Sequence, residues 1–428
     1  QFFAHSYGFR PMRDTHMAVE RLKDIVYKTS YGWAIEGDIS KFFDNVNHNI
    51  LLKKMYGLGI RDNKVLMIVK QMLKAGVMNN ITRNEIGTPQ GGIISPLLAN
   101  IYLHSFDKFV TREWETIKTK YQFTSNRNKY QSLHNKTNQI PRYLIRYADD
   151  WIILTNSKEN AEKLKYKVDK FLKENLKLKL SEDKTKITNL HKKRIDFLGF
   201  RYRTIPIERG KSTRPFTSSL TIDEDKFADK IKSIRREIKM LSRQPNQKVI
   251  ISKINNINSK IRGILEYYSS SQKIYIIASK YSKGITMKSL KILKKHFSEA
   301  TLMEANKVCN LISVHSKYNT QIASVKYENL WFGLTDPSFI CWKMRPLKNQ
   351  KETPYSSEGR NIYNTKKGKT SPLTRLDELT HKSEQIHLTI WGYTKSIYNL
   401  EYFMNRAYAY NRDNFKCRKC GSNENLNT

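Results

Sequence analysis

Two adjacent carboxylates, Asp149 and Asp150, interrupt the otherwise apolar stretch YLIRYADDWIILTN at residues 143–156. An ionised carboxylate away from water is costly unless a cation or hydrogen-bond donor compensates it, and two neighbouring ones repel each other. Hard divalent cations such as Mg²⁺ prefer oxygen ligands, commonly one or two carboxylates together with substrate phosphates. The pair is therefore a candidate metal site, and a solvated turn is the alternative reading of a DD pair alone.

Asp38 is the second candidate ligand, because it ends the strand expected at the start of the stretch WAIEGDISKFFDNV, residues 33–46. Trp33 and Ile35 are expected on one face of a strand there. Successive strand side chains point to opposite faces, so one site cannot easily use both Asp149 and Asp150, and we expect Asp149 to be the primary ligand. Asp38 and Asp149 together would hold two metal ions about 3.5–4 Å apart, the arrangement that assists phosphoryl transfer. Asp44 is expected to be structural or capping.

Alternating strands and helices must position these carboxylates. The pattern predicts a mostly helical 1–31, a strand ending at Asp38, helical spacing over 47–75, and a Gly/Pro-rich loop that becomes an apolar helix over 85–107. It then predicts a polar loop or insertion over 118–141 and a strand–turn–strand hairpin over 143–156. A helix over 158–175 and short strands within 177–187 and 195–203 follow.

Long amphipathic helices are expected after residue 226, with helical signals continuing to about 320. Between 226 and 300 the chain has 18 basic and 4 acidic residues. Apolar residues recur at helical spacing in two runs, which are Phe227, Ile231, Ile234, Ile238, Leu241 and Ile250, Ile254, Ile257, Ile261, Leu265. Mixed strands and helices followed by an all-helical region indicate an α+β domain with a helical appendage.

Composition restricts the partners. The chain has 77 Lys plus Arg against 39 Asp plus Glu, a formal net charge of +38, which favours a polyanion such as nucleic acid. Part of the lysine excess is consistent with an AT-rich genome. Four cysteines favour a reducing compartment, and no apolar run is long enough to span a bilayer. We expect a fragment of a longer protein, because the chain starts without Met.

Six motifs resemble one known family in the same order. YADD at 147–150 resembles the catalytic box of reverse transcriptases, and GTPQGGIISPLLANIYL at 87–103 is similar to the PQG box of group II intron reverse transcriptases. The further matches are SYGFRP (6–11), DISKFFD (38–44), KLKLSEDKTKI (177–187) and FLGF (197–200). The resemblance covers 1–203 and implies a right-hand polymerase, although the first fingers boxes of the family are absent.

The resemblance also implies a domain order. We expect fingers and palm over 1–205, a linker over 206–225, a helical thumb or maturase (X) domain over 226–335, a basic DNA-binding region over 336–410, and the truncated start of an HNH endonuclease domain over 411–428.

The same resemblance implies roles for individual residues. The catalytic residues are Asp38, Asp149 and Asp150, and the ligands of two Mg²⁺ ions include Asp38, Ile39 and Asp149. Phe43 takes the position of the aromatic residue that packs under the sugar and excludes a 2′-hydroxyl, with Phe42 in the core. The residues expected to contact nucleotide or template are Ile39, Phe43, Arg10, Gln90, Gly91 and Lys184. Glycine lets the backbone approach the nucleotide.

Several of these roles have structural alternatives. Phe43 excludes the 2′-hydroxyl, or else is simply a core residue. Gln90 and Gly91 contact nucleotide or template, or else form a plain loop-to-helix joint. Arg10 contacts template or nucleotide, or else makes a structural ion pair. Lys184 neutralises the triphosphate or protonates pyrophosphate, or else is a solvated lysine.

The basic region carries a seventh match. RGILEYY at 262–268 resembles the RG-x-x-x-YY signature of the maturase region, in which Arg262 is expected to reach RNA phosphate or cap a helix. Tyr267 and Tyr268 are expected to pack in the core rather than stack on bases. Basic faces suit structured RNA, which proteins contact mainly through phosphates and 2′-hydroxyls.

Cysteines give a weaker signal at the end of the chain. Cys417 and Cys420 form one CxxC pair, half of a tetrahedral zinc site. Cys309 and Cys341 lack that spacing and are expected to be core cysteines. Endonuclease activity is expected only in a longer protein.

Three functions follow from the resemblance. The first is an RNA-directed DNA polymerase that binds intron RNA, a DNA target and dNTPs and supports splicing and target-primed retrohoming. The second is a splicing-only maturase, and the third a domesticated reverse transcriptase without mobility. The expected location is the bacterial cytoplasm or nucleoid, with the mitochondrial matrix as the alternative.

Overall fold

The computed structural model describes residues 2–74, 86–88, 92–208, 215–345, 347, 349–353 and 356–367. Its contacts divide the chain into two compact units. Among the described residues, the first unit holds 2–8 and 15–345, and the second holds 9–14 and those from 347 onward.

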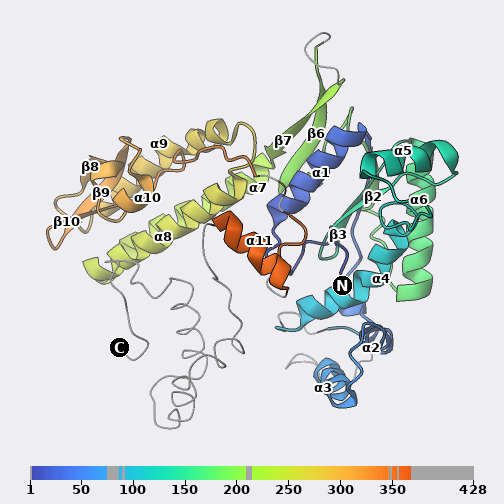
Figure 1. Cartoon of the computed structure of the whole chain (residues 1–428). Coiled ribbons are helices and arrows are strands. Elements are labelled where there is room, and N and C mark those ends of the chain that lie inside the picture. Colours follow the sequence, from blue (N-terminus) through green and yellow to red (C-terminus); the bar gives the residue numbers. More distant parts are fainter. Residues whose placement is uncertain are drawn as a thin grey trace. The chain divides into compact units, whose positions relative to one another are not determined.

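Four antiparallel strands form the central sheet of the first unit, in the order β2–β3–β1–β4 (Figure 1). The strands are β1 (Trp33–Gly37), β2 (Tyr143–Tyr147), β3 (Asp150–Thr155) and β4 (Lys186–Asn189). Strands β2 and β3 make the hairpin predicted for 143–156, and β1 ends just before Asp38 as predicted. Both predictions are confirmed. The strands could be predicted because apolar residues mark them in the sequence.

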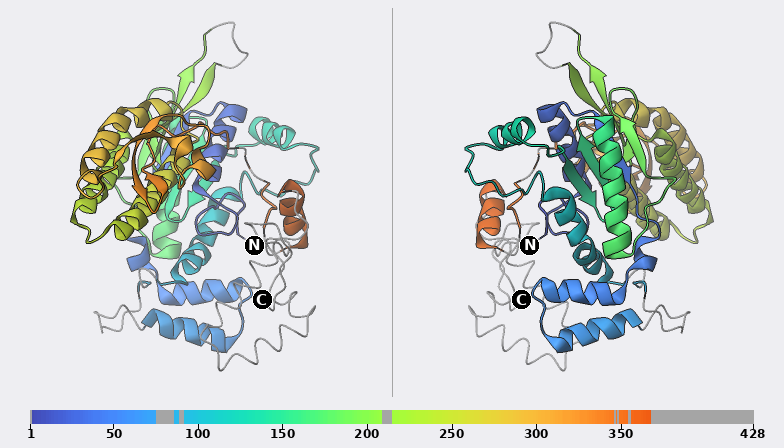
Figure 2. Two further views of the ribbon diagram at one scale, coloured as in Figure 1. Left: turned by 90° about the vertical axis from the view of Figure 1, so that its left-hand side faces the viewer. Right: turned by 90° about the vertical axis from the view of Figure 1, so that its right-hand side faces the viewer.

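The two faces of this sheet bury different helices. Ile35, Leu144 and Ile153 share a core with α4 (Ser95–Thr111) and α6 (Lys158–Phe171), and Figure 2 shows α6 lying along the sheet. Trp33 packs on the same side as Ile35, as predicted. Ala34, Ile152 and Leu154 belong to the opposite core, which includes α1 (Thr15–Thr29). Alternating residues of each strand therefore serve two cores.

Helical predictions in the first half of the chain are confirmed in part. The stretch 47–75 contains α2 (His48–Gly57) and α3 (Asn63–Lys74), and α4 begins with Pro96 in its first turn. Helix α6 continues as a π-helical turn over Leu172–Leu176. The helix predicted over 1–31 is wrong before Thr15. The polar loop predicted over 118–141 contains α5 (Asn126–Lys136), which buries only Leu133 and so lacks an apolar repeat.

The predicted linker over 206–225 is wrong for the residues that the structure describes there. Strands β5 (Ile195–Phe197), β6 (Phe200–Pro206) and β7 (Phe216–Ile222) form a sheet, in which β6 pairs with β7 from Phe200↔Ile222 to Pro206↔Phe216. Leu220 and Ile222 are buried, while the other side chains of FTSSLTI are mostly small and polar. The composition resembled a linker, but the buried alternate residues make a strand.

Three amphipathic helices follow, as predicted. They are α7 (Glu224–Met240), α8 (Gln247–Tyr268) and α9 (Ile274–Leu293). All ten apolar residues of the two predicted runs are buried. They belong to the same core as α1, β2 and the β5–β7 sheet, so the core continues across the predicted domain boundary.

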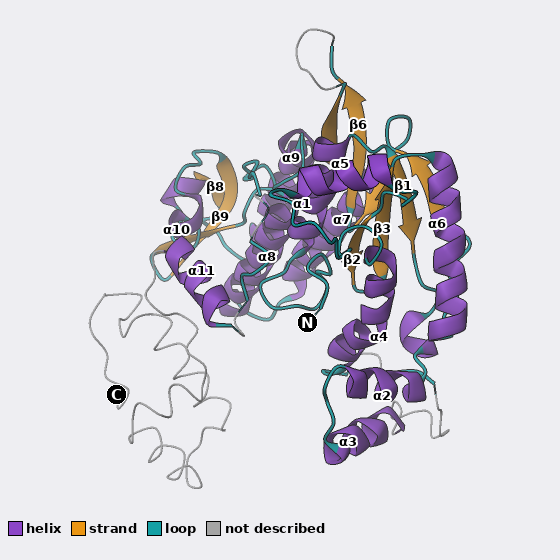
Figure 3. Ribbon diagram, turned by 45° about the vertical axis from the view of Figure 1, so that its right-hand side comes forward, coloured by secondary structure: helices purple, strands orange, loops and turns teal. Residues whose placement is uncertain are grey.

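The helical prediction fails between 301 and 320. Strand β8 (Thr301–Glu304) begins this stretch, and the short α10 (Ile312–His315) follows it. β8 forms a three-stranded sheet with β9 (Gln321–Tyr327) and β10 (Leu330–Gly333), of which Figure 3 labels β8 and β9. Val308 and Leu311 are apolar at near-helical spacing, but they bury against Ile322 of β9 in a separate small core. The expected all-helical appendage is therefore helical and sheet-containing.

In the second unit, α11 (Ser357–Lys367) is the described helix, and Arg13 Nη1 donates to the Glu352 carbonyl at 3.2 Å. Among the helices that the structure describes, none is both long enough and apolar enough to cross a membrane.

Candidate active site

Asp38 and the YADD turn lie at the same end of the central sheet. The pairing of β1 with β3 ends at Gly37↔Trp151, so Asp38 and Asp150 are the next residues in register. Asp149 lies in the two-residue turn that follows the Tyr147↔Asp150 pair. The predicted convergence of Asp38 with Asp149 and Asp150 is therefore present in the fold.

The electrostatics of the three carboxylates reflect this proximity. Burial raises the pKa of Asp149 above its ordinary value, and the negative charge of Asp38 raises it further. Burial, followed by the charges of Asp149 and Asp38, raises the pKa of Asp150 to about 6. Lys184 opposes both shifts. Groups whose pKa values are displaced by burial and by one another are typical of functional sites.

Lys184 stands over Asp38, with Nζ 3.0 Å from Asp38 Oδ2. The backbone of its segment is held by Ser181 N, which donates to the Asp38 carbonyl at 2.9 Å, and by the Lys179 carbonyl, which accepts from Ser40 N at 3.0 Å. The hydrogen bond from Lys184 to Asp38 raises the pKa of the lysine. Lys184 is thus not merely solvated, although its side chain is 69% exposed.

The donor set fits a hard cation. Asp38 and Asp149 supply carboxylate oxygens, while the Ile39 side chain is buried, so only its backbone is left to contribute. Neither hydrogen bond around the Ile39–Leu180 bridge uses the Ile39 carbonyl. The described residues contain no cluster of three or more His, Cys, Asp or Glu able to hold a metal ion. A cation here would complete its ligand shell with phosphate and water oxygens.

Phe43 lies beside the start of the PQG motif. Phe42 is buried and Phe43 half-buried in a 3₁₀ turn over Phe42–Asn45, as expected for one core and one accessible ring. The Phe43 carbonyl accepts from Thr88 N at 2.7 Å, and His48 Nε2 lies 2.6 Å from the Gly87 carbonyl oxygen. Gln90 and Gly91 lie outside the described residues, but the chain that leads to them is anchored next to Phe43.

The remaining predicted residues lie elsewhere. Arg10 belongs to the second unit and is half-buried. Arg262 on α8 is half-buried and donates to Ser259 Oγ at 3.2 Å. Cys341 is exposed, so the expectation of a core cysteine there is wrong, and Cys309 is only half-buried. Cys417 and Cys420 lie outside the described residues.

The two tyrosines of RGILEYY pack as predicted. Tyr268 is buried, and Tyr267 stacks on Phe200 with ring centroids 5.5 Å apart. Tyr267 Oη donates to the Leu198 carbonyl at 2.8 Å, and the Tyr267 carbonyl lies 2.7 Å from His16 Nε2. The motif therefore joins α8 to α1 and to the turn between β5 and β6.

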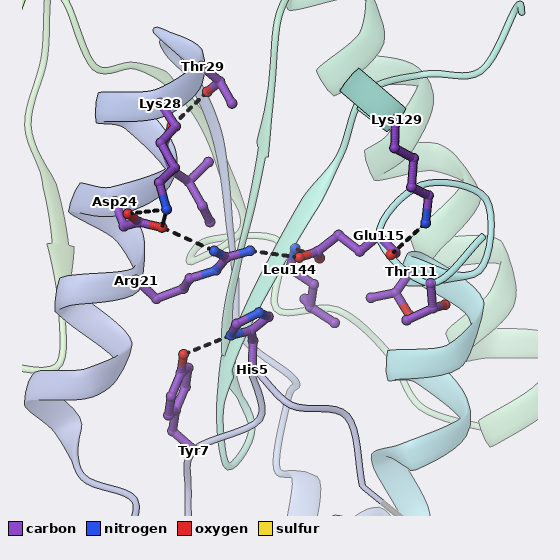
Figure 4. Close-up of polar contacts among 12 residues, drawn as sticks. His5, Tyr7, Arg21, Asp24, Lys28, Thr29, Thr111, Glu115, Lys129 and Leu144 are labelled. Carbon is purple, nitrogen blue, oxygen red and sulfur yellow. Dashed lines mark hydrogen bonds and ion pairs between the residues drawn. The ribbon is translucent and has the colours of Figure 1, made fainter. Parts of the chain in front are cut away.

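A cavity of about 1230 Å³ opens at the other end of the central sheet, where β1 and β2 begin. Its lining includes Tyr31, Tyr143 and Glu115, and none of the candidate site residues. Figure 4 shows Arg21 pointing toward Glu115, with Nη2 and Oε1 3.0 Å apart, while Glu115 Oε2 accepts from Leu144 N at 2.9 Å. Burial raises the pKa of Glu115 to about 6 against the opposing effect of Arg21. This cavity is separate from the carboxylate site.

Sequence reasoning missed Arg146 and Asp107. Arg146 lies in the apolar strand β2 and Asp107 in the apolar helix α4, and both side chains are fully buried as an ion pair. The available signals were a single charge within the apolar strand β2 and an acidic residue within the mostly apolar helix α4.

The sequence is similar to that of several known proteins. Residues 1–202 match the family described as Reverse transcriptase (RNA-dependent DNA polymerase). The chain is 32% identical over 326 residues to the Group II intron-encoded protein LtrA of Lactococcus lactis subsp. cremoris, covering 61% of this chain and 52% of that protein. It is 26% identical over 297 residues to the Putative COX1/OXI3 intron 2 protein of Saccharomyces cerevisiae, covering 62% and 33%.

Among solved structures, apo telomerase from Candida tropicalis is a distant likeness, with 13% identity, a TM-score of 0.39, and coverage of 68% of this chain and 49% of that one.

Residues 1–202, just under half of the chain, are thus similar to reverse transcriptases. About three fifths of the chain is similar to the two intron-encoded proteins named above. The chain spans about half the length of the LtrA protein that it matches.

Proposed function

We propose that this protein is an RNA-directed DNA polymerase that also binds group II intron RNA as a maturase. The observation that carries the polymerase half is the meeting of Asp38 with Asp149 and Asp150 at one end of the sheet, with Lys184 paired to Asp38. The three carboxylates repel one another, and the Lys184 ammonium is the cation beside them. Such a site suits metal and nucleotide binding, because its negative charge is neutralised only when they bind.

Asp38 and Asp149, with the Ile39 backbone, would hold two Mg²⁺ ions. When bound, these ions would neutralise the negative charge that develops on the attacking and leaving oxygens during nucleotide transfer. Asp150 extends the negative potential of the site and binds a proton with a pKa of about 6. Protons and cations therefore compete for the same carboxylates.

Lys184 and Phe43 act on the nucleotide. When a triphosphate binds, the Lys184 ammonium would leave Asp38 and pair with phosphate oxygens, or would protonate the leaving pyrophosphate. Phe43 is half-buried, its carbonyl accepts a hydrogen bond from Thr88 Oγ1, and its ring would exclude a 2′-hydroxyl and so select deoxynucleotides. Arg10, Gln90 and Gly91 are proposed to contact template or nucleotide.

The maturase half rests on charge. Helices α7–α9 bury one apolar face each and carry basic residues on their other faces, within a stretch of 18 basic and 4 acidic residues. Such faces suit the phosphates of folded RNA, with Arg262 as one contact. Retrohoming, a zinc site at Cys417 and Cys420, and a location in the bacterial cytoplasm or the mitochondrial matrix belong to the same proposal.

Asp149→Asn tests the polymerase half. We expect at least about a thousandfold loss of primer extension on an RNA template, because one charged metal ligand is lost. Binding and splicing of intron RNA should remain. Asp44→Asn is the matched control, since it removes an exposed carboxylate of the same DISKFFD motif. Normal extension by Asp149→Asn would refute the metal assignment, and a splicing-only maturase would show no extension in the wild type.

A further inference from the structure

The turn that carries Asp149 has an unfavourable backbone. It joins β2 and β3 through Ala148 and Asp149, and Ala148 has φ 57°. A residue with a Cβ rarely adopts this left-handed conformation and needs support from its surroundings. The question is what holds the turn in place.

A buried charge cluster contacts the turn from the α4 side. Arg146 makes a two-pronged ion pair with Asp107, with Nε–Oδ1 at 2.6 Å and Nη2–Oδ2 at 2.7 Å, and neither side chain is exposed. The remaining nitrogen, Nη1, donates to the Ala148 carbonyl at 2.8 Å and to Asn100 Oδ1 at 3.1 Å. The planar guanidinium thereby ties the turn to two residues of α4.

The N-terminal segment closes the other side of the cluster. Asn100 Nδ2 donates to the Gly8 carbonyl at 2.9 Å, and the backbone of Arg146 pairs with His5 O and Tyr7 N. A Cβ on Gly8 would lie 2.3 Å from Ala148 N, so the Gly8 backbone lies directly against the turn. The turn is thus fixed between residues 5–8 and α4.

We propose that Arg146, with Asp107 and Asn100, is the positioning group of the catalytic turn and sets the affinity of Asp149 for its metal ion. This inference rests on the proposed function of Asp149. Asp107 neutralises Arg146, so the guanidinium provides rigid donors to Ala148 while its charge is largely balanced. Because Asn100 and Asp107 belong to the helix of the PQG motif, that helix supports the carboxylate turn directly.

Arg146→Lys is the first test, because lysine keeps the positive charge but lacks the several fixed N–H donors of the planar guanidinium. Mn²⁺ binding is followed by the loss of the free-ion EPR signal, using the 428-residue chain with a chain-terminated DNA primer on an RNA template and the matching dNTP. We expect binding to weaken by about 10–100-fold, as for other groups that orient metal ligands. The Mg²⁺ half-saturation of primer extension should rise in parallel, with KM for primer–template unchanged.

Arg142→Lys is the matched control. Arg142 is also buried, lies one residue before β2, away from the turn, and pairs with Glu113 Oε2 at 2.5 Å. We expect it to lower the Tm but leave Mn²⁺ binding as in the wild type. Asn100→Ala is the second variant, because it spares the ion pair, and it should weaken Mn²⁺ binding in the same direction by about threefold or more.

The outcomes separate the two proposals. If Arg146→Lys does not fold, Asn100→Ala decides. Wild-type Mn²⁺ binding in the folded variants, or equal weakening in Arg142→Lys, overturns the positioning role. If Asp149→Asn itself leaves Mn²⁺ binding and extension intact, the proposed function fails. If Asp149→Asn abolishes both while the Arg146 and Asn100 variants behave as wild type, only this inference fails.

Discussion

The negative charge of the Asp150 carboxylate is only partly compensated by the residues around it. Its side chain is exposed, yet partial burial and the neighbouring Asp149 and Asp38 raise its pKa from 3.8 to about 6. The folded chain therefore binds this proton more tightly than the unfolded chain does. Ionisation of Asp150 reduces stability as the pH rises from about 4 through about 6, and the reduction is complete above that range.

Asp150→Asn should therefore raise the Tm at pH 7.5 without Mg²⁺. The expected gain is about 1–2 °C, since solvent screening at this exposed site keeps the effect below about 1 kcal/mol. The gain should disappear below pH ~4, where Asp150 is protonated in both states, and shrink when Mg²⁺ is added. Scanning calorimetry across pH measures it, with Asp44→Asn as the control. A gain that is independent of pH would argue against charge repulsion.

Gly37 is a residue whose missing side chain matters. Gly37 immediately precedes Asp38, and a Cβ on it would lie 2.0 Å from the Trp151 ring. Gly37→Ala should lower the free energy of unfolding by about 1–3 kcal/mol through overpacking. Gly57→Ala is the matched control, because nothing lies within 4 Å of its Cβ position and it should be neutral or slightly stabilising. Urea unfolding of both variants decides, and equal stabilities would contradict the packing at Trp151.

At the scale of elements, the joint between α8 and the β5–β6 turn depends on Tyr267. Leu198 and Gly199 in that turn have φ values of 51° and 78°, and the Tyr267 hydroxyl bonds the Leu198 carbonyl. This bond is the polar link between the RGILEYY helix and the FLGF turn.

Tyr267→Phe should destabilise the protein by about 1 kcal/mol, because the carbonyl of the half-buried Leu198 loses this donor while ring stacking on Phe200 remains. Thermal unfolding should show a Tm lower by about 2–4 °C. Tyr166→Phe, at a 70% exposed position on α6, should leave the Tm unchanged. An unchanged Tm for Tyr267→Phe would mean that the joint is held by ring packing alone.

Elements with a dense apolar repeat were predictable from the sequence. Ile250, Ile254 and Ile257 mark α8 because their burial requires one helical face, whereas α5 buries only Leu133 and carries no such signal. Strand β7 resembled a linker because only alternate residues at its end are large and buried.

The candidate site was predictable to a similar extent. Asp38 and Asp149 were predictable because each follows an apolar strand. Strands β1 and β2 run in the same direction on either side of β3, so the two strand ends lie at one edge of the sheet. The pairing of Arg146 with Asp107 was not, because an ion pair between a strand and a helix depends on which faces pack together. The Lys184–Asp38 contact likewise depends on the path of residues 178–185, which form no strand.

At the scale of the whole molecule, the net charge of +38 should govern RNA binding. Binding constants for intron RNA should fall steeply with salt if many phosphates are neutralised. Replacing Lys283, Lys291 and Lys294 on and after α9 by Gln should reduce the slope of log K against log salt by about 2. Filter binding at several salt concentrations measures the slope.

The matched control removes the same charge from an exposed face of α6, through Lys163→Gln, Lys167→Gln and Lys170→Gln. This triple variant should change the slope by less than half as much, because α6 covers the palm sheet rather than the basic helices. Equal changes in the two triple variants would mean that the charge acts as a diffuse field, and a shallow wild-type slope would mean that the lysine excess is compositional.

The shared core across residue 206 has a practical consequence for anyone seeking a minimal polymerase. A chain cut after β6 would strip that strand of its β7 partner and uncover Phe200 and Tyr202, which are almost wholly shielded by β7, α7 and α8. An unpaired strand edge next to exposed aromatic side chains promotes self-association. Such a truncated chain should precipitate on expression, and a soluble shortened protein has to retain the helices α7, α8 and α9.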